Sequence, residues 1–581
     1  MNEQESRKID PPSFRDFSLL FPPATAGDLR RAARELDPYA QRDLGIERIV
    51  AAFWPDKEKQ KEVVPVICSL LCDPEGIRYR QEILQDFLDH PVLVEKLESL
   101  FPAIDTMVRY AYRTSQESDS LQAVIWRLGE LQSILDCIRG LGEIFASLDG
   151  VLHSRGMQIL QAEVLNLNND ATIQRLSTHL PELLQKLRAC VSITIGVNLD
   201  PSLRPVQVVL LSVHDEPFTD QGLINKLFGH KQEFVGLAPL HSVPQRAVPG
   251  HYAFPISSEL GLAVEPMMIP LFADLARVMK KTTAPIAKQL KRYSEIRGRM
   301  FTTLRNDLLF YLGAVHLIRR LMEHGLPVCR PDIAPQNERR CEVSSSYNLN
   351  LALHMIEQDV ILPEGITMND ILIGGDGRIL ILTGPNQGGK TTYMQGIGLV
   401  QLLAQIGCYV PGTTALISPA DQIYSHFPLE EQPDADTGRF GEEASRIGKI
   451  FEQVTRNSLV LLNESLSSTS LGESLYLAQD IVRILRRLGA RAIYSTHIHE
   501  LAERAGEMNE SVPGESQITS VVSSPVEIDP QISTVGIRRS YKIEFRLPLG
   551  LSYAREIAAR YGISYEQLEK ALQDRGELSN S

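Results

Sequence analysis

The sequence predicts a multidomain protein that is mainly α-helical in its first half and contains an α/β domain in its second half. The chain has 581 residues, which is too long for one hydrophobic core. Apolar residues recur at helical spacing through most of residues 1–190, whereas strand-like and helix-like segments alternate from about residue 340 to about residue 500. Pro327, Pro331 and Pro335 break the pattern between these two regions.

Amphipathic segments account for most of the predicted helical region. Asp73-Pro74-Glu75-Gly76 marks a junction before the first of them. The segments with helical spacing are Ile77–Phe87, Val92–Leu100, Leu121–Leu148 and Ala171–Val191. Helical spacing returns between Pro270 and His324, so a second helical stretch is predicted before the α/β region.

A β-rich insertion separates the two helical stretches. The runs Ser192–Leu199 and Val206–Val213 flank Asp200-Pro201-Ser202, which predicts a hairpin. Residues 228–255 are rich in Gly, Pro and His and predict a loop with short strands. Further along the chain, residues 526–549 predict short strands or loop. Two terminal helices are predicted at residues 552–560 and 565–575, with Ser564 as an N-cap.

The composition limits the class of protein and its compartment. A net charge of −13 argues against a protein that coats nucleic acid non-specifically, although it leaves room for a local basic surface. Seven scattered cysteines without a CxxC pair make a poor disulfide framework and favour a reducing cytoplasm. The sequence contains no secretory signal and no apolar run of about 18 residues, so we expect a cytoplasmic protein with no membrane partner.

A glycine-rich motif follows the strand-like run Ile379–Leu382 and precedes a predicted helix at Tyr393–Ile406. This strand–loop–helix context is that of a phosphate-binding P-loop, in which glycine backbone N–H groups surround phosphate oxygens at the start of a helix. Lys390 would contact the β- and γ-phosphates, and the Thr391 hydroxyl would bind Mg²⁺. The alternative is an ordinary glycine-rich turn. We therefore predict a site for ATP and Mg²⁺ formed by Gly384, Pro385, Asn386, Gln387, Gly388, Gly389, Lys390, Thr391 and Thr392.

Two further strand-like runs end in polar residues that suit ATP hydrolysis. Ser458–Leu462 precedes Asn463 and Glu464, and Glu464 would orient or deprotonate the attacking water. Asn463 offers a carbonyl oxygen to Mg²⁺ but carries no negative charge. The run 492–496 ends at His497, where a side chain at the carboxyl edge of a parallel sheet would sense the γ-phosphate or hold the water. The alternatives are a buried strand with polar ends and a structural histidine.

Together these motifs resemble the ATPase domain of the MutS family of DNA mismatch-repair proteins. The resemblance is specific over residues 360–510 and weaker in Asp73–Val108 and Leu308–Pro331, which are similar to the family's helical core. The motifs that carry it are Thr383-Gly384-Pro385-Asn386-x-Gly388-Gly389-Lys390-Thr391-Thr392, Asn369-Asp370, Gly407-Cys408-Tyr409-Val410-Pro411, Ser458–Leu462 with Glu464 and Thr469-Ser470, and Ser495-Thr496-His497-Ile498-His499-Glu500-Leu501.

The resemblance implies an architecture and an activity. It implies a helical core with lever helices at residues 1–336, a small β-containing clamp inserted at about 192–260, an ABC-type ATPase domain at 337–545, and a C-terminal helix-turn-helix at 546–581. It also implies a homodimer formed through the ATPase domain, with ATP binding and hydrolysis opening and closing the clamp on DNA. The basic cluster between Arg277 and Arg299 favours such a DNA contact, although a solvated surface with ion pairs explains it equally well.

Four departures from the family pattern qualify this expectation. We expect no N-terminal mismatch-reading and connector domains, because the resemblance to the helical core begins by about residue 70. Asn463 replaces an Asp, which predicts slow hydrolysis. The turn Ser465–Ser468 lacks the family's glycines, and Asp436–Phe440 stands where relatives present a Ser-Thr-Phe-like signature to the partner's nucleotide. Arg439 would serve there as a cation in trans, or simply begin a helix. The competing hypothesis is a nucleotide-gated dimeric scaffold with little or no ATPase activity that holds a protein partner. An unrelated P-loop kinase is disfavoured by the motif at 496–501.

Overall fold

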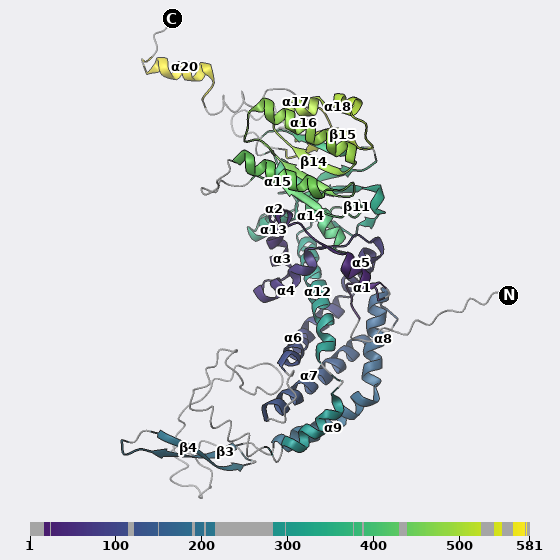
Figure 1. Ribbon diagram of the computed structural model, residues 1–581, viewed down its shortest axis with the longest axis vertical. Helices are drawn as coiled ribbons and strands as arrows, with labels where there is room; N and C mark the ends of the chain where they lie inside the picture. The colour runs from purple at the N-terminus through teal and green to yellow at the C-terminus, as the bar shows by residue number, and fades with distance from the viewer. Residues whose placement is uncertain are drawn as a thin grey trace, which may run out of the picture. The chain divides into compact units, whose positions relative to one another are not determined.

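A computed structural model describes residues 17–113, 121–188, 192–216, 283–428, 439–523, 540–548 and 562–577, with short gaps within these ranges (Figure 1). The chain divides into two compact units. The first comprises Met1–Glu95, Gly150–Ile159 and Asn306–Ser581, and the second comprises Lys96–Asp149 and Leu160–Arg305. The predicted loop at residues 228–255 and the terminal helix at 552–560 lie outside the described residues, as do Asn386, Gln387 and 436–438.

A six-stranded sheet forms the centre of the α/β region in the first unit. Its strand order is β12-β13-β14-β9-β15-β16, and all neighbours pair in parallel except the edge strand β16. The sequence prediction of alternating strands and helices is therefore confirmed. The strands are β9 (Gly377–Thr383), β12 (Ile423–His426), β13 (Leu459–Asn463), β14 (Arg491–Ser495), β15 (Gln517–Ser523) and β16 (Ile543–Glu544).

Helices cover both faces of this sheet, which is why every residue of β13 and β14 is buried. Side chains alternate between the faces along each strand, so Val460 and Leu462 meet one layer of helices while Leu461 meets α14 on the other face. Helices α15, α16, α17 and α18 form the layer on the first face, and Figure 1 shows them next to β14 and β15. The helices are α14 (Lys390–Gln405), α15 (Arg439–Gln453), α16 (Leu471–Leu488), α17 (His499–Glu503) and α18 (Ala505–Ser511).

The first unit also contains a smaller mixed sheet, of which three strands precede β9 in the sequence and one, β11, follows α14. The strand order of this sheet is β6-β11-β7-β8, and a separate short pair joins β5 to β10. Helix α13 follows β7 and packs against α3 and α14, and its N-cap Asn348 accepts a hydrogen bond from the Leu351 N–H. The bounds are β5 (Val328–Cys329), β6 (Asp332–Ile333), β7 (Cys341–Ser346), α13 (Leu349–Glu357), β8 (Asn369–Ile373), β10 (Val410–Pro411) and β11 (Thr414–Ile417).

The N-terminal segment of the first unit packs directly on the α/β region. Helix α2 lies against β12, and buried Asp43 accepts hydrogen bonds from Ser425 and from the Phe427 N–H. Asp43 also forms a buried ion pair with Arg446 of α15. Sequence patterns predicted helices here but not this contact. The elements are α1 (Ala26–Ala32), β1 (Arg34–Glu35), α2 (Pro38–Asp43), α3 (Ile46–Phe53), α4 (Lys57–Ile67), β2 (Ser69–Leu70) and α5 (Pro74–Asp89).

The second unit contains the long helices and the predicted hairpin. β3 (Ser192–Leu199) and β4 (Pro205–His214) pair antiparallel, which confirms the hairpin within a residue at each strand end. The expected helix from Pro270 to His324 is wrong in its middle, because 3₁₀ turns at Lys291–Tyr293 and Gly298–Phe301 interrupt it. Buried Arg127 donates to the carbonyls of Tyr293 and Ile296, both at 2.6 Å, and so stabilises the interruption.

The remaining helices complete the described chain. Helices α6, α8 and α12 are divided between the two units, whereas α7 and α9 belong to the second unit. Ser564 caps α20 through a hydrogen bond from the Gln567 N–H, as predicted. None of the helices in the described ranges is long and apolar enough to cross a membrane. The helices are α6 (Pro91–Arg113), α7 (Leu121–Ala146), α8 (Arg155–Asn169), α9 (Ala171–Arg188), α12 (Thr302–Glu323) and α20 (Tyr565–Asp574).

Candidate nucleotide-binding site

The glycine-rich loop connects the carboxyl end of β9 to the first turn of α14. Gly384 has φ +141° and Gly389 has φ +87°, values that glycine adopts readily. A side chain at Gly384 would also collide with Ser523 at the end of the neighbouring strand β15. The Ser523 hydroxyl donates a hydrogen bond to the Gly388 carbonyl, so β15 supports the loop from beside it. The N–H groups of the first turn of α14, which have no partner within the helix, thus follow a glycine that β15 supports, and such a helix start suits phosphate.

Lys390 is buried inside this loop, with 4% of its side chain exposed. Its Nζ donates to the carbonyl oxygens of Gly384 and Pro385, both at 3.0 Å, and lies 3.8 Å from Oε1 of Glu464. Burial lowers the pKa of Lys390, and the Glu464 carboxylate opposes that shift. Lys390 and Glu464, which are distant in sequence, are therefore direct neighbours.

Thr391 and Asn463 face each other at the same edge of the sheet. Asn463 Nδ2 donates to Thr391 Oγ1 at 3.2 Å, and the Asn463 Oδ1 lies 3.4 Å from the same hydroxyl oxygen. Both groups supply oxygen atoms, which Mg²⁺ prefers, but neither supplies charge. No cluster of three or more His, Cys, Asp or Glu side chains able to hold a metal occurs among the described residues. This pair fits a magnesium ion whose other ligands come from nucleotide phosphates and water.

Strand order explains how Glu464 and His497 reach this edge. β14 lies between β9 and β13, so the carboxyl ends of the three parallel strands are adjacent. Glu464 follows β13 directly, its N–H donates to the Ser495 carbonyl at 2.8 Å, and its side chain is 34% exposed. His497 follows β14 and is exposed, whereas burial lowers the pKa of the neighbouring His499. The two histidines therefore differ in exposure, with His497 open to solvent.

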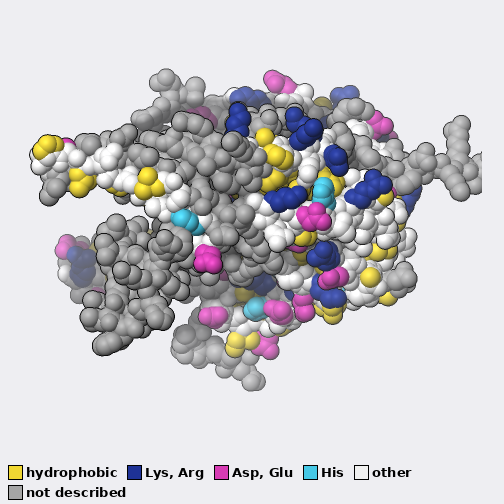
Figure 2. Space-filling model, turned by 90° about the horizontal axis from the view of Figure 1, so that it is seen from below, with side chains coloured by type: hydrophobic (Ala, Val, Ile, Leu, Met, Phe, Trp, Pro, Cys, Tyr) yellow, Lys and Arg dark blue, Asp and Glu magenta, His cyan; other side chains and the backbone are white. Residues whose placement is uncertain are grey.

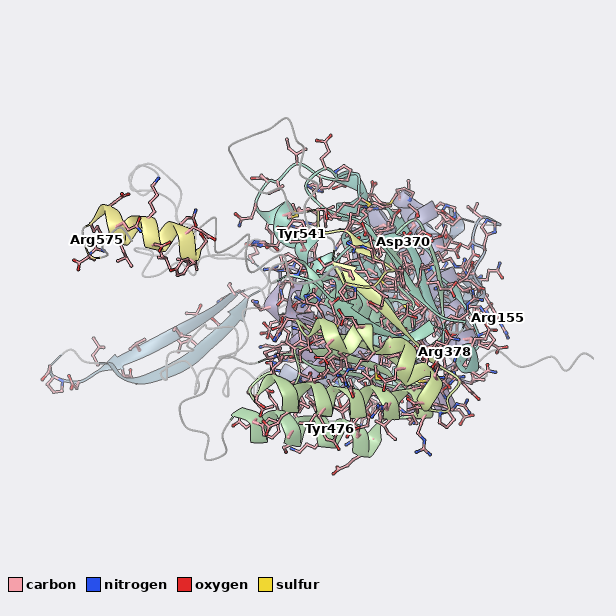
Figure 3. All side chains as sticks on the ribbon, turned by 90° about the horizontal axis from the view of Figure 1, so that it is seen from above. Arg155, Asp370, Arg378, Tyr476, Tyr541 and Arg575 are labelled. Atoms are coloured by element: carbon pink, nitrogen blue, oxygen red, sulfur yellow. The ribbon has the colours of Figure 1, made fainter. Side chains whose placement is uncertain are left out.

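Tyr541 is a site residue that the sequence did not reveal. Its ring lies 3.3 Å from the position that a Gly389 Cβ would occupy, and the residue is 44% exposed with φ +52°. Asn369 of β8 holds it in place, because its Nδ2 donates to the Tyr541 carbonyl and its Oδ1 accepts from the Ile543 N–H. Figure 3 shows Tyr541 and Asp370 labelled in the same region of the first unit. A lone tyrosine carries no sequence signal for such a position.

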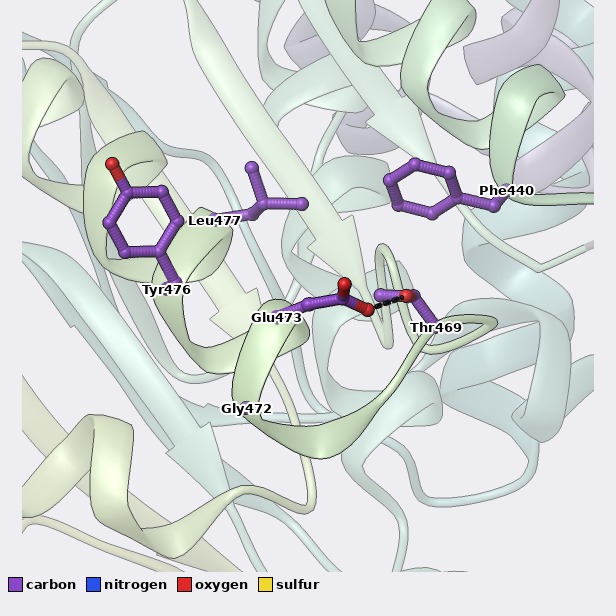
Figure 4. A pocket seen from close by; sticks show the side chains of 6 residues that line it. All are labelled: Phe440, Thr469, Gly472, Glu473, Tyr476 and Leu477. Carbon is purple, nitrogen blue, oxygen red and sulfur yellow. Dashed lines mark hydrogen bonds between the residues drawn. The ribbon is translucent and has the colours of Figure 1, made fainter.

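A shallow hollow of about 320 Å³ lies between the start of α15 and the start of α16. Figure 4 shows the rings of Phe440 and Tyr476 in its wall and the hydrogen bond from Thr469 to Glu473 at its floor. None of the P-loop residues lines it, so it is separate from the phosphate site. Its apolar walls are exposed: Tyr476 and the adjacent Leu471 are each 64% exposed.

The basic cluster predicted from the sequence falls in the second unit. Lys288, Lys291 and Arg292 are exposed, whereas Arg277, Lys281 and Arg297 lie outside the described residues. On the face of the molecule in Figure 2, Lys and Arg side chains are interspersed with Asp and Glu side chains. That face therefore carries both signs of charge.

Comparisons with known proteins agree with the geometry. The family model described as MutS domain V matches residues 380–547, and the model described as MutS2 N-terminal domain matches residues 72–324. A protein named DNA mismatch repair protein MutS from Bacillus pumilus is 25% identical over 449 residues, which cover 75% of this chain and 50% of the relative. The protein of the same name from Prochlorococcus marinus is 32% identical over 217 residues, covering 37% of this chain and 23% of the relative. The matches span half or less of these relatives.

Proposed function

This chain is a MutS-family protein, partial relative to full-length MutS, and we propose that it is an ATPase that binds ATP with Mg²⁺ and hydrolyses it slowly. The observation that carries the proposal is the convergence of Lys390, Thr391, Asn463 and Glu464 at one sheet edge. Such an edge is where open α/β sheets bind nucleotides. ATP is the nucleotide expected from MutS domain V.

Each side chain has a distinct task in this proposal. When ATP binds, the Lys390 ammonium group gives up its hydrogen bonds to two loop carbonyls and donates to phosphate oxygens instead. These charged acceptors bind it more strongly and offset the energetic cost of burying its charge. Glu464 accepts a hydrogen bond from the attacking water and orients it, and His497 contacts the γ-phosphate from β14. Tyr541 presents its ring beside Gly389, where the base or ribose would lie.

Thr391 and Asn463 would hold the magnesium ion, which supplies charge neutralisation between the phosphates when bound. Asn463 contributes an amide oxygen in place of a carboxylate, so the protein adds no negative charge there beyond Glu464. Weak metal retention and slow turnover follow from this neutral pair.

We also propose the larger arrangement that membership of the family suggests. Residues 1–336 form the core and levers, with a clamp at 192–260, residues 337–545 form the ATPase domain, and residues 546–581 form a C-terminal helical dimerisation segment. Exposed Phe440, Leu471 and Tyr476 support a second copy docking on the ATPase domain. Exposed Lys288, Lys291 and Arg292 support contact with DNA phosphates by the second unit.

A second candidate is a nucleotide-gated dimeric scaffold that binds ATP but hardly hydrolyses it and holds a protein partner. The neutral Thr391–Asn463 pair favours this candidate, because it weakens the metal site without disturbing the P-loop.

Nucleotide binding and turnover measured with homoduplex, mismatched and branched DNA separate the two candidates. The ATPase proposal predicts ATP binding that Lys390→Met abolishes and turnover that at least one DNA structure stimulates. It also predicts DNA affinity that falls steeply with salt concentration. ATP binding without stimulation by any DNA, together with salt-independent DNA affinity, would favour the scaffold.

A further inference from the structure

The turn that carries Glu464 has a backbone conformation that its residues disfavour. Glu464 has φ +45° and Leu466 has φ +61°, both in the left-handed region that residues with side chains seldom adopt. No glycine occurs between Glu464 and Gly472 to relieve this conformation. The surrounding structure must therefore impose it, and backbone strain of this kind is common at functional sites.

Three buried side chains hold this turn. The Tyr494 hydroxyl donates to the Ser465 carbonyl at 2.9 Å, and the Ser474 hydroxyl donates to the Leu466 carbonyl at 2.7 Å. His426 Nδ1 is hydrogen-bonded to the Ser465 hydroxyl at 2.8 Å. Ser465 is thus held through both its main chain and its side chain.

The sheet register explains why Tyr494 and His426 reach the same residue. Leu462 of β13 pairs with His426 of β12 on one side and with Tyr494 of β14 on the other. Residues paired in register in a parallel sheet point to the same face, so the two side chains flank β13 just before its end. The chain then turns at Glu464, and Ser465 comes back between them.

The environment of His426 suits this task. The imidazole is buried, and burial with the adjacent Arg446 lowers its pKa to about 4, opposed by Asp43. The ring is therefore neutral at ordinary pH, and it holds Ser465 without placing a second positive charge near Glu464. Tyr494 is neutral as well, because burial raises its pKa.

We propose that Tyr494 and His426 are positioning residues for Glu464, which they fix toward the attacking water by clamping Ser465 from the two strands that flank β13. This inference rests on the proposed ATPase function. Neither side chain touches the nucleotide in this proposal, so each should affect the rate of the chemical step and leave ATP affinity unchanged.

The test uses the full chain with Tyr494→Phe, which removes one hydroxyl and leaves the ring. The matched control is Tyr311→Phe in α12, because the Tyr311 hydroxyl is also buried and also donates to a backbone carbonyl, that of Leu19 at 2.7 Å. We expect Tyr494→Phe to lower kcat about three- to tenfold, the value of one hydrogen bond, with ATP affinity unchanged. Tyr311→Phe should leave both unchanged.

His426 is tested by its conservative variant. His426→Asn keeps a polar atom near the position of Nδ1 and should retain most of the wild-type kcat, whereas His426→Ala should lower it. Ser465→Ala removes the same bond from the other side, so combining it with His426→Ala should reduce kcat no further than either change alone.

Hydrogen exchange of the segment 463–468 provides a readout that does not need hydrolysis. Faster exchange in Tyr494→Phe but not in Tyr311→Phe supports the clamp even if wild-type protein proves inactive, which would reject the ATPase proposal separately. Unchanged exchange and kcat in Tyr494→Phe overturn the inference. An equal loss of ATP affinity and kcat also overturns it, because Tyr494 would then act on binding.

Discussion

Replacing Asn463 with Asp adds one carboxylate beside the Thr391 hydroxyl, in a position where the native side chain is only 5% exposed. Two unit charges 4 Å apart at an effective dielectric constant of about 20 interact by roughly 4 kcal/mol, and a divalent ion strengthens this further. Desolvation of the buried carboxylate offsets most of the gain. A net effect of about 1–2 kcal/mol remains, so the Mg²⁺ concentration for half-maximal activity should fall about five- to thirtyfold.

The same change should lower the free energy of unfolding of the nucleotide-free protein, because an ionised Asp cannot donate a hydrogen bond to Thr391 and its buried charge is not neutralised by a metal ion. The assay is ATP turnover as a function of Mg²⁺ concentration, together with urea unfolding without nucleotide. Asn457→Asp is the matched control, because it adds the same charge just before the opposite end of β13. If Asn463→Asp leaves both the Mg²⁺ dependence and the rate unchanged, the assignment of Asn463 to the metal is wrong.

Three further changes test the surroundings of the site. The pKa of His426 is about 4 in the folded protein against an ordinary 6.5, so the unfolded state binds the extra proton first. The contribution of His426 to the free energy of unfolding should be fully present above pH 6.5 and should fall by up to about 3 kcal/mol as the pH drops toward 4. Urea unfolding of His426→Asn should not show this loss. Arg446→Met removes the buried ion pair of Asp43 and leaves that carboxylate paired only with Arg42, whose side chain is 44% exposed; the change should cost about 2–3 kcal/mol in the same assay, partly recovered by adding Asp43→Asn. Tyr541→Ala should weaken ATP binding about tenfold while Tyr541→Phe does not, as measured with a fluorescent nucleotide.

The strands that deliver the site were predictable because each is a short apolar run that ends in polar residues. Gly377–Thr383, Leu459–Asn463 and Arg491–Ser495 lie within two residues of the runs expected from the sequence. Strands buried on both faces of a parallel sheet consist mostly of apolar residues, so these strands could be recognised from local composition. The loop and helix after β9 followed from glycine and lysine spacing for the same local reason.

Features that depend on strand order were not predictable. The position of β13 between β12 and β14 determines that His426 and Tyr494 flank Leu462, and no local pattern encodes that order. Tyr541 lies next to Gly389, which is far from it in the sequence, because the strand that follows Tyr541, β16, pairs with β15. The contact of Asp43 with Arg446 likewise joins segments about 400 residues apart, beyond the reach of sequence periodicity.

ATP turnover by wild-type protein and by Glu464→Ala, compared at saturating Mg²⁺ and ATP, tests the central claim most directly. We expect slow turnover in the wild type, loss of at least about a hundredfold in Glu464→Ala, and ATP binding that persists in both. Equal turnover in the two proteins would contradict the role of Glu464. Tight ATP binding with no turnover in the wild type would contradict the claim that this sheet edge hydrolyses ATP.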